Sequence, residues 1–186
     1  MIGFAMCGSF CNFGSAFEEL EKLVEMGEEV VPIMSDNVYT TDTRFGKAKE
    51  FIERAEKLCG REVVHTITQA EPLGPKIKLD ALCICPCTGN TLAKLSCGIC
   101  DTPVTLSAKA HLRNERPLVI ALASNDSLLG NAENFGRMLA RRNVYFVPLR
   151  QDDAKAKPRS LVCDFTKLQE TIEKAKNGSQ IQPILI

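Results

Sequence analysis

The sequence lacks several features that would place it in a class at once. None of its apolar runs approaches the roughly 20 residues of a membrane-spanning helix, and no repeat or low-complexity linker divides its 186 residues. The formal net charge is zero, so charge alone does not point to nucleic acid as a partner. The first residues, MIGFAMCGSF, lack the charged and long apolar regions of a secretory leader. We therefore expect a soluble, cytosolic protein with a single domain over residues 1–186.

Cysteine, in contrast, is abundant, but its pattern argues against a metal site or a disulfide framework. The nine cysteines are an odd number in a chain long enough to bury a core without disulfides. Cys83, Cys85 and Cys87 alternate along an expected strand, about 6 to 7 Å apart, which is too far to share one tetrahedral zinc. A CxxC at Cys97 and Cys100 has no second CxxC at zinc-finger spacing. We predict no metal site and interpret the cysteines as small packing residues, except that Cys87, beside the proposed pocket, stays open.

Strand and helix patterns alternate along the whole chain. This alternation predicts a three-layer α/β/α sandwich with a mainly parallel, six-stranded sheet, of the Rossmann-like or flavodoxin-like kind. We expect the core to span about residues 1–148, followed by a C-terminal extension over 149–186 that starts with a charged connection at 149–160. The expected strands cover residues 1–6, 28–35, 61–68, 79–85, 116–123 and 144–148.

Local signals place the ends of several elements. Ser15 and Glu18 form a capping-box pattern at the start of the first helix, and Gly27 suits its C-terminal end. Pro32 cannot donate to a sheet ladder, so either its backbone nitrogen faces away from the ladder or its strand lies at an edge. Pro86 is expected to end the fourth strand.

Small polar turns follow three of the expected strands. Open α/β sheets bind ligands beyond the carboxyl ends of their strands, where helix N-termini offer free amides to phosphates. A tight turn or a helix cap explains each of these segments equally well when it is taken alone. Together they outline a cleft of the size that a mononucleotide needs. The turns are CGSFC at residues 7–11, PCTGNT at 86–91 and ASNDSLLGN at 123–131.

The same turns resemble the flavin-containing cysteine decarboxylases and their relatives. The resemblance covers about residues 1–148 and rests on IGFAMCGS, PCTGNTLAKLSCGICDTPVTLSAKA and RPLVIALASNDSLLGNAENFGRML. It implies a flavoprotein fold, flavin mononucleotide (FMN) as cofactor and assembly into a homo-oligomer. The cofactor-binding residues that it implies are Gly8, Ser9, Ser35, Thr88, Gly89, Asn90, Thr91, Ser124 and Asn125.

Three departures separate the chain from those decarboxylases. Pro72 stands at the offset of their catalytic histidine, and Ser124 stands where their motif has methionine, although Asn125 is kept. QDDAKAKPRSLVCDF does not resemble their glycine-rich substrate clamp. The catalytic residues therefore stay unassigned, and neither His65, expected in the core, nor His111, expected on the surface, is given a catalytic role.

A second resemblance covers essentially the whole chain. TTDTRFGKA, AEPLGP, TGNTLAKL, AKAHLRNERPLV, NVYFVP and QDDAKAKPRSLV resemble the family of dipicolinate synthase B subunits. It implies oxidation of dihydrodipicolinate to dipicolinate in the mother-cell cytoplasm of a sporulating bacterium. The implied partner is a dehydrogenase-like A subunit that carries NAD(P).

The implied substrate is a small dianion, so cationic side chains are expected to bind it. Arginine suits a carboxylate best, because it can donate two parallel hydrogen bonds. Arg44, in the polar loop after the second strand, and Lys76 are the candidate substrate-binding residues. Two alternatives remain beside the synthase role. One is an FMN-dependent decarboxylase or flavin-modifying enzyme, and the other is a non-catalytic scaffold that keeps the flavoprotein fold.

Overall fold

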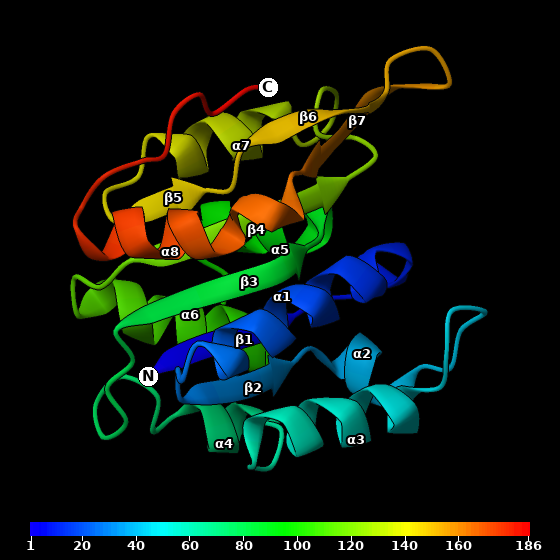
Figure 1. Cartoon of the computed structure of the whole chain (residues 1–186). Coiled ribbons are helices and arrows are strands. Elements are labelled where there is room, and N and C mark those ends of the chain that lie inside the picture. Colours follow the sequence, from blue (N-terminus) through cyan, green and yellow to red (C-terminus); the bar gives the residue numbers. More distant parts are fainter.

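The computed structural model describes all 186 residues and shows a central sheet between two helical layers (Figure 1). The strand order is β2-β1-β3-β4-β7-β6, and β5 also pairs with β4. Strands β1 to β5 pair in parallel, whereas β7 runs antiparallel to both β4 and β6. The predicted mainly parallel α/β fold is confirmed, with seven strands in place of six. The strands are β1 Ile2–Met6, β2 Val30–Met34, β3 Ala81–Cys87, β4 Leu118–Ser124, β5 Val144–Phe146, β6 Leu149–Asp153 and β7 Lys157–Cys163.

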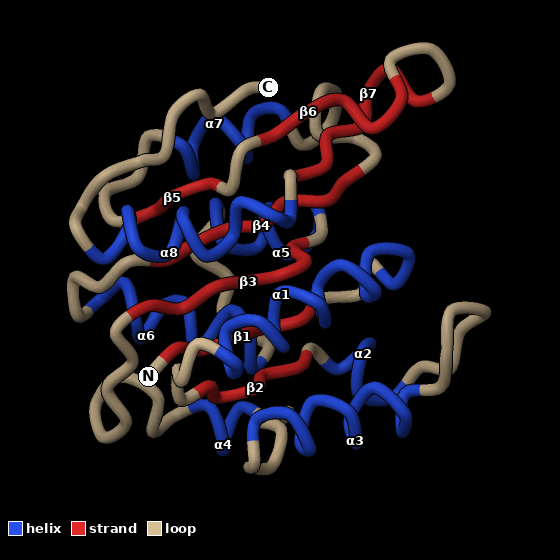
Figure 2. Tube along the Cα trace, in the orientation of Figure 1, coloured by secondary structure: helices blue, strands red, loops and turns tan.

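Helices cover both faces of this sheet (Figure 2). Helices α1 (Phe13–Glu25) and α8 (Leu168–Lys176) pack together on one face. Helices α5 (Gly89–Ser96), α6 (Pro103–Arg113) and α7 (Ala132–Leu139) lie on the other. Near the β2 edge lie three more helices, and two 3-10 turns precede α1 and α8. These elements are α2 Asp36–Thr40, α3 Ala48–Cys59, α4 Ile67–Ala70, η1 Phe10–Asn12 and η2 Phe165–Lys167.

One hydrophobic cluster of 46 buried residues fills the space between the layers. The extension after residue 148 contributes to this cluster, because Leu149, Leu161, Leu168 and Ile172 are almost fully buried in it. The extension therefore packs on the same core as the preceding residues. No helix combines the length and the apolar character that crossing a membrane requires.

Two predicted elements are wrong, and both errors have a local cause. Residues 61–68 form no strand: Val64 makes a single bridge to Ile33, and Thr66 then caps α4 by accepting a hydrogen bond from the amide of Gln69. The charged connection at 149–160 is instead most of the β6–β7 hairpin. Most residues of the hairpin are exposed, so the sequence lacks the alternation of apolar and polar residues that identifies a half-buried strand. Hydrogen bonds between the two backbones form the ladder without this pattern.

The signals at element ends give a mixed result. Pro32 lies on the edge strand β2, one of the two predicted arrangements, and Gly27, which follows the C-cap residue Met26 of α1, has a φ of 83°, as predicted. However, α1 begins at Phe13, so Ser15 lies inside the helix and is not its cap. Strand β3 also continues through Pro86, whose carbonyl accepts a hydrogen bond from the amide of Cys7 at 3.1 Å.

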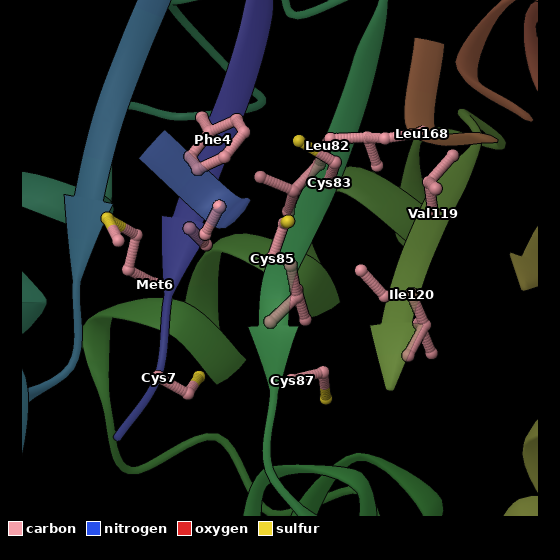
Figure 3. Packing of buried hydrophobic residues seen from close by; sticks show 14 of the residues in the cluster. Phe4, Met6, Cys7, Leu82, Cys83, Cys85, Cys87, Val119, Ile120 and Leu168 are labelled. Atoms are coloured by element: carbon pink, nitrogen blue, oxygen red, sulfur yellow. The ribbon is translucent and has the colours of Figure 1, made fainter. Parts of the chain in front are cut away.

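The cysteines of β3 serve as packing residues. Cys83, Cys85 and Cys87 have no exposed surface and lie beside apolar side chains such as Ile120 of the neighbouring strand (Figure 3). Burial raises the pKa of all three thiols, so they remain protonated and apolar at neutral pH. The packing interpretation is confirmed for Cys83 and Cys85, and Cys87, which was left open, is buried in the same way; the interpretation is wrong for Cys11 and Cys97, which are exposed. All nine cysteines are free thiols.

Candidate functional site

A cavity with a volume of about 1090 Å³ opens at the carboxyl ends of β1, β3 and β4. This is the end of a parallel sheet at which ligands bind, and the volume suits a cofactor. Most of the predicted site residues line this cavity, whereas Ser35, Thr91 and Lys76 do not. Those that line it are Gly8, Ser9, Arg44, Thr88, Gly89, Asn90, Ser124 and Asn125.

Hydrogen bonds on the buried side of the turn after β3 fix its conformation. Thr88 is the N-cap of α5, and its Oγ1 accepts a hydrogen bond from the amide of Thr91 at 3.2 Å. The buried Thr91 hydroxyl donates in turn to the sulfur of Cys7 at 3.2 Å. Burial raises the pKa of Cys7 to about 11, so this thiol stays neutral. Thr91 thus fixes the turn, while the first-turn amides of Gly89 and Asn90 have no carbonyl partner within the helix.

The other two residues outside the cavity have different positions. Ser35 follows β2, and its amide donates to the carbonyl of Met6 at 3.0 Å, which ties the end of β2 to the end of β1. Lys76 lies in the connection that leads into the first residue of β3, Ala81. Lys76 is therefore close to the amino end of the sheet, opposite the cavity, and it does not meet Arg44.

The turn after β4 forms a closed network of polar side chains against Gly89. Ser124 Oγ donates to Asp126 Oδ1 at 2.6 Å, and Asn131 Nδ2 donates to both oxygens of Asp126 at 2.9 and 2.8 Å. A Cβ atom on Gly89 would lie only 2.5 Å from Ser124 Oγ. Glycine is required here because the β4 turn closes directly on the start of α5.

The predicted cofactor-binding residues did not include Asp126 and Asn131, although both belong to the turn at 123–131 that was expected to border the cleft. Both line it, and Asn131 occupies the N-cap position of α7. The sequence signal that could have indicated their contact is an aspartate in a turn, Asp126, followed five residues later by an asparagine at a helix start, Asn131. That pattern is short and common, so only the network identifies its purpose.

The outer wall of the cavity has a different character. Arg44 and Phe45 come from the loop before α3, and the guanidinium carbon of Arg44 lies 4.8 Å from the centroid of the Phe45 ring. The β6–β7 hairpin contributes Asp152 and Lys157, which form an ion pair at 2.6 Å, and also Ser160. The hydrogen bond from Lys157 to Asp152 raises the pKa of Lys157, which therefore stays charged. The hairpin residues were missed because the segment was predicted to be a connection.

Comparisons with known proteins agree with this geometry. The Flavoprotein family matches residues 2–174. The B subunit of dipicolinate synthase from Bacillus subtilis (strain 168) is 44% identical over 185 residues, which cover 100% of this chain and 92% of that protein. The crystal structure of the dipicolinate synthase B subunit from Bacillus halodurans has a TM-score of 0.92 and 42% identity, and covers 100% of this chain and 95% of that one.

A more distant relative shares the fold. The structure of the FMN-dependent cysteine decarboxylase SpaF has a TM-score of 0.67 and 21% identity, and covers 94% of this chain and 95% of that one. The resemblance to the dipicolinate synthase B subunits is therefore confirmed, and the resemblance to the flavin-containing decarboxylases is confirmed for the fold. The chain belongs to the flavoprotein family and, within it, to the dipicolinate synthase B subunits.

Proposed function

We propose that this chain is the B subunit of a dipicolinate synthase and binds FMN in the cavity at the carboxyl ends of β1, β3 and β4. It acts with a dehydrogenase-like A subunit that carries NAD(P), and the pair oxidises dihydrodipicolinate to dipicolinate in the mother-cell cytoplasm during sporulation. The chain itself assembles into a homo-oligomer. The observation that carries the proposal is the joint placement of three polar turns around one cavity of about 1090 Å³ in a member of this family.

The residues at the cavity fit a flavin nucleotide. Ser9 lies before η1 and Thr88 before α5, so hydroxyls and first-turn amides from two helix starts are available to a phosphate. Phe10 and Phe45 offer aromatic surface to a planar ring, and Asn90 offers both a donor and an acceptor. Asp126 keeps its negative charge, but its oxygens already accept hydrogen bonds from Ser124 and Asn131, so we place the phosphate at the helix starts rather than beside Asp126. When bound, the flavin would supply a ring able to accept and return a hydride.

The chain's own residues then bind and orient the reactants. Thr88 and Asn90 hold the cofactor side of the cavity, and the β4 turn fixes the wall behind it. Arg44 faces the same cavity from the outer wall and provides a cation for a carboxylate of the substrate. The β6–β7 hairpin lines the same side of the cavity through Asp152, Lys157 and Ser160.

The alternative of an autonomous decarboxylase has less support, because neither histidine reaches the cavity. His65 is not a core residue: it is partly exposed and stacks on Tyr39, with ring centroids 3.7 Å apart. His111 is not a surface residue: it is buried on α6, and its Nε2 lies 2.9 Å from the carbonyl oxygen of Pro117. Both positions differ from those expected from the sequence.

The test uses the purified chain and the A subunit, separately and together. The chain should show flavin absorbance, or gain it on incubation with FMN, and the pair should form dipicolinate faster than the A subunit alone. Asn90→Ala should weaken FMN binding and slow the pair, whereas Asn177→Ala, at the exposed end of α8, should change neither. A chain that never binds FMN would remove the flavin part of the proposal. An A subunit that alone matches the pair in rate would remove the catalytic part.

A further inference from the structure

The cavity contains two cationic side chains, and both lie on its outer wall. Arg44 belongs to the loop before α3, and Lys157 belongs to the β6–β7 hairpin. These two segments extend beyond the carboxyl end of the sheet on the same side of the molecule (Figure 1). They are far apart in the sequence, so only the fold brings them to one cavity.

We propose that Arg44 and Lys157 together form a two-point binding site for a planar dicarboxylate, each cation binding one carboxylate. This inference rests on the proposed function, because it names the substrate side of the same cavity. It adds Lys157 as a binding residue and replaces Lys76, which lies near the other end of the sheet.

Arg44 is free of ionic partners, and its guanidinium is positioned beside an aromatic ring. It forms no ion pair with any residue of the chain, so its guanidinium keeps its donors for a bidentate carboxylate contact. The Phe45 ring beside it, 4.8 Å from the guanidinium carbon to the centroid, limits the directions that the side chain can take. An aromatic acid could also use the exposed face of this ring.

Lys157 is held by an anion that a ligand can replace. Its ammonium contacts the carboxylate of Asp152 at 2.6 Å, and both side chains are well exposed, at 58% and 37%. Exposed pairs of this kind contribute little net free energy, so a substrate carboxylate can take the place of Asp152 at small cost. Asp152 then serves as the resting counter-ion of the binding site.

The inner wall does not offer a competing site for the dicarboxylate. Its side chains are neutral or, at Asp126, negative and already hydrogen-bonded to Ser124 and Asn131. Neutral donors at helix starts suit the cofactor phosphate, and the two cations remain for the substrate. The cavity is thus divided by chemistry into a cofactor wall and a substrate wall.

The experiment compares a diacid with a monoacid on the full-length chain. Calorimetric titration with pyridine-2,6-dicarboxylate and with pyridine-2-carboxylate measures what the second carboxylate contributes. Lys157→Gln should lower the affinity for the diacid about tenfold, the size of one lost charge-assisted hydrogen bond, and leave the monoacid nearly unchanged. Arg44→Gln should lower the affinity for both acids. Lys155→Gln removes the same charge from the same hairpin outside the cavity and should change neither.

Two results would contradict the proposed two-point site. The inference fails if the wild-type chain does not bind the diacid, or if Lys157→Gln weakens both acids equally or neither. FMN titration and the rate of the two-subunit reaction, measured on wild type, test the proposed function separately. Normal FMN binding and a normal rate, together with a diacid affinity that Lys157→Gln does not change, would reject this binding site and keep the proposed function.

Discussion

The two ends of the central sheet differ in whether their charged and polar groups have partners within the chain. At the amino end, charges of the chain neutralise one another: the Met1 amine contacts Asp80 at 2.7 Å, and Lys176 contacts Glu28 at 2.9 Å. At the carboxyl end, Arg44 has no ionic partner, and the first-turn amides of α5 face a cavity of about 1090 Å³. At the amino end these charges are paired within the chain, whereas at the carboxyl end a cation and helix amides remain available to a ligand.

The difference follows from the direction of the chain. In a parallel sheet, each strand delivers its carboxyl end to a helix N-terminus, where amides lack carbonyl partners. A smaller cavity of about 500 Å³ does exist at the amino end, lined by Lys78, Leu79, Asp80, Arg116 and Lys176. Two of these residues, Asp80 and Lys176, already have an opposite charge within the chain, so this cavity is less suited to a ligand.

The largest predicted effect lies at the amino end and concerns pH. Burial lowers the pKa of His111 from 6.5 to about 4, so the unfolded chain takes up a proton first as the pH falls. Stability that is complete above pH 6.5 should decline between pH 6.5 and 4, by about 3 kcal/mol from this group. His111→Gln should flatten this part of a urea-unfolding pH profile. An equal slope in variant and wild type would contradict the assignment.

The next effect is at the carboxyl end. Gly89→Ala places a Cβ 2.5 Å from Ser124 Oγ and 2.7 Å from Asn131 Nδ2. We expect a loss of about 2 kcal/mol in the free energy of unfolding, together with weaker FMN binding, because the β4 turn must move. The matched control is Gly14→Ala in α1, where a Cβ meets nothing within 4 Å. It should raise stability by about 0.5 kcal/mol. Urea unfolding distinguishes the two, and equal effects would show that the close contact at Gly89 is not important.

Variants of two helix N-caps can distinguish an effect on the free energy of unfolding from an effect on FMN binding. Thr88 caps α5 at the cavity, and Thr102 caps α6 outside it, each accepting a hydrogen bond from an amide three residues on. Thr88→Ala and Thr102→Ala should each cost about 1 kcal/mol of stability. Only Thr88→Ala should also weaken FMN binding in a fluorescence titration. A similar loss of FMN affinity in both variants would mean that the cap acts through general stability alone.

The smallest effect compares exposed ion pairs at the two ends. Asp80→Asn and Asp152→Asn should each change the free energy of unfolding only slightly, because solvent screens both pairs. Asp152→Asn should also bind pyridine-2,6-dicarboxylate about threefold more tightly, since Lys157 loses its competing anion. Asp80→Asn should leave this affinity unchanged in the same calorimetric titration. A gain in both variants would point to a general effect of net charge.

Much of the fold could be predicted, and the errors are instructive. Five strands and their mainly parallel direction follow from apolar runs separated by amphipathic helices, because burial on both faces selects such runs. The predicted strand at 61–68 failed because Thr66 and Gln69 form a capping box, a local hydrogen-bond pattern that favours a helix start. His111 was placed on the surface because helical position alone does not show which neighbours cover it.

The candidate site was only partly predictable for the same reason. Gly8, Thr88 and Ser124 were identified because each lies at or just after the end of a strand, and strand ends can be located from the sequence. The position of Lys76 outside the cavity could not be predicted, because a long connection can return to either end of a sheet. The positions of Asp126 and Lys157 at the cavity depend on contacts with Gly89 and Asp152 rather than on a motif.

The sequence by itself determined the alternation of strands and helices, the parallel core and the small polar turns that follow β1, β3 and β4. These features depend on side-chain periodicity and turn chemistry, which act over a few residues. Only the tertiary structure decided that the β6–β7 hairpin lines the cavity and that Arg44 and Lys157 share it. That arrangement depends on packing between segments far apart in the chain, for which the local pattern contains no signal.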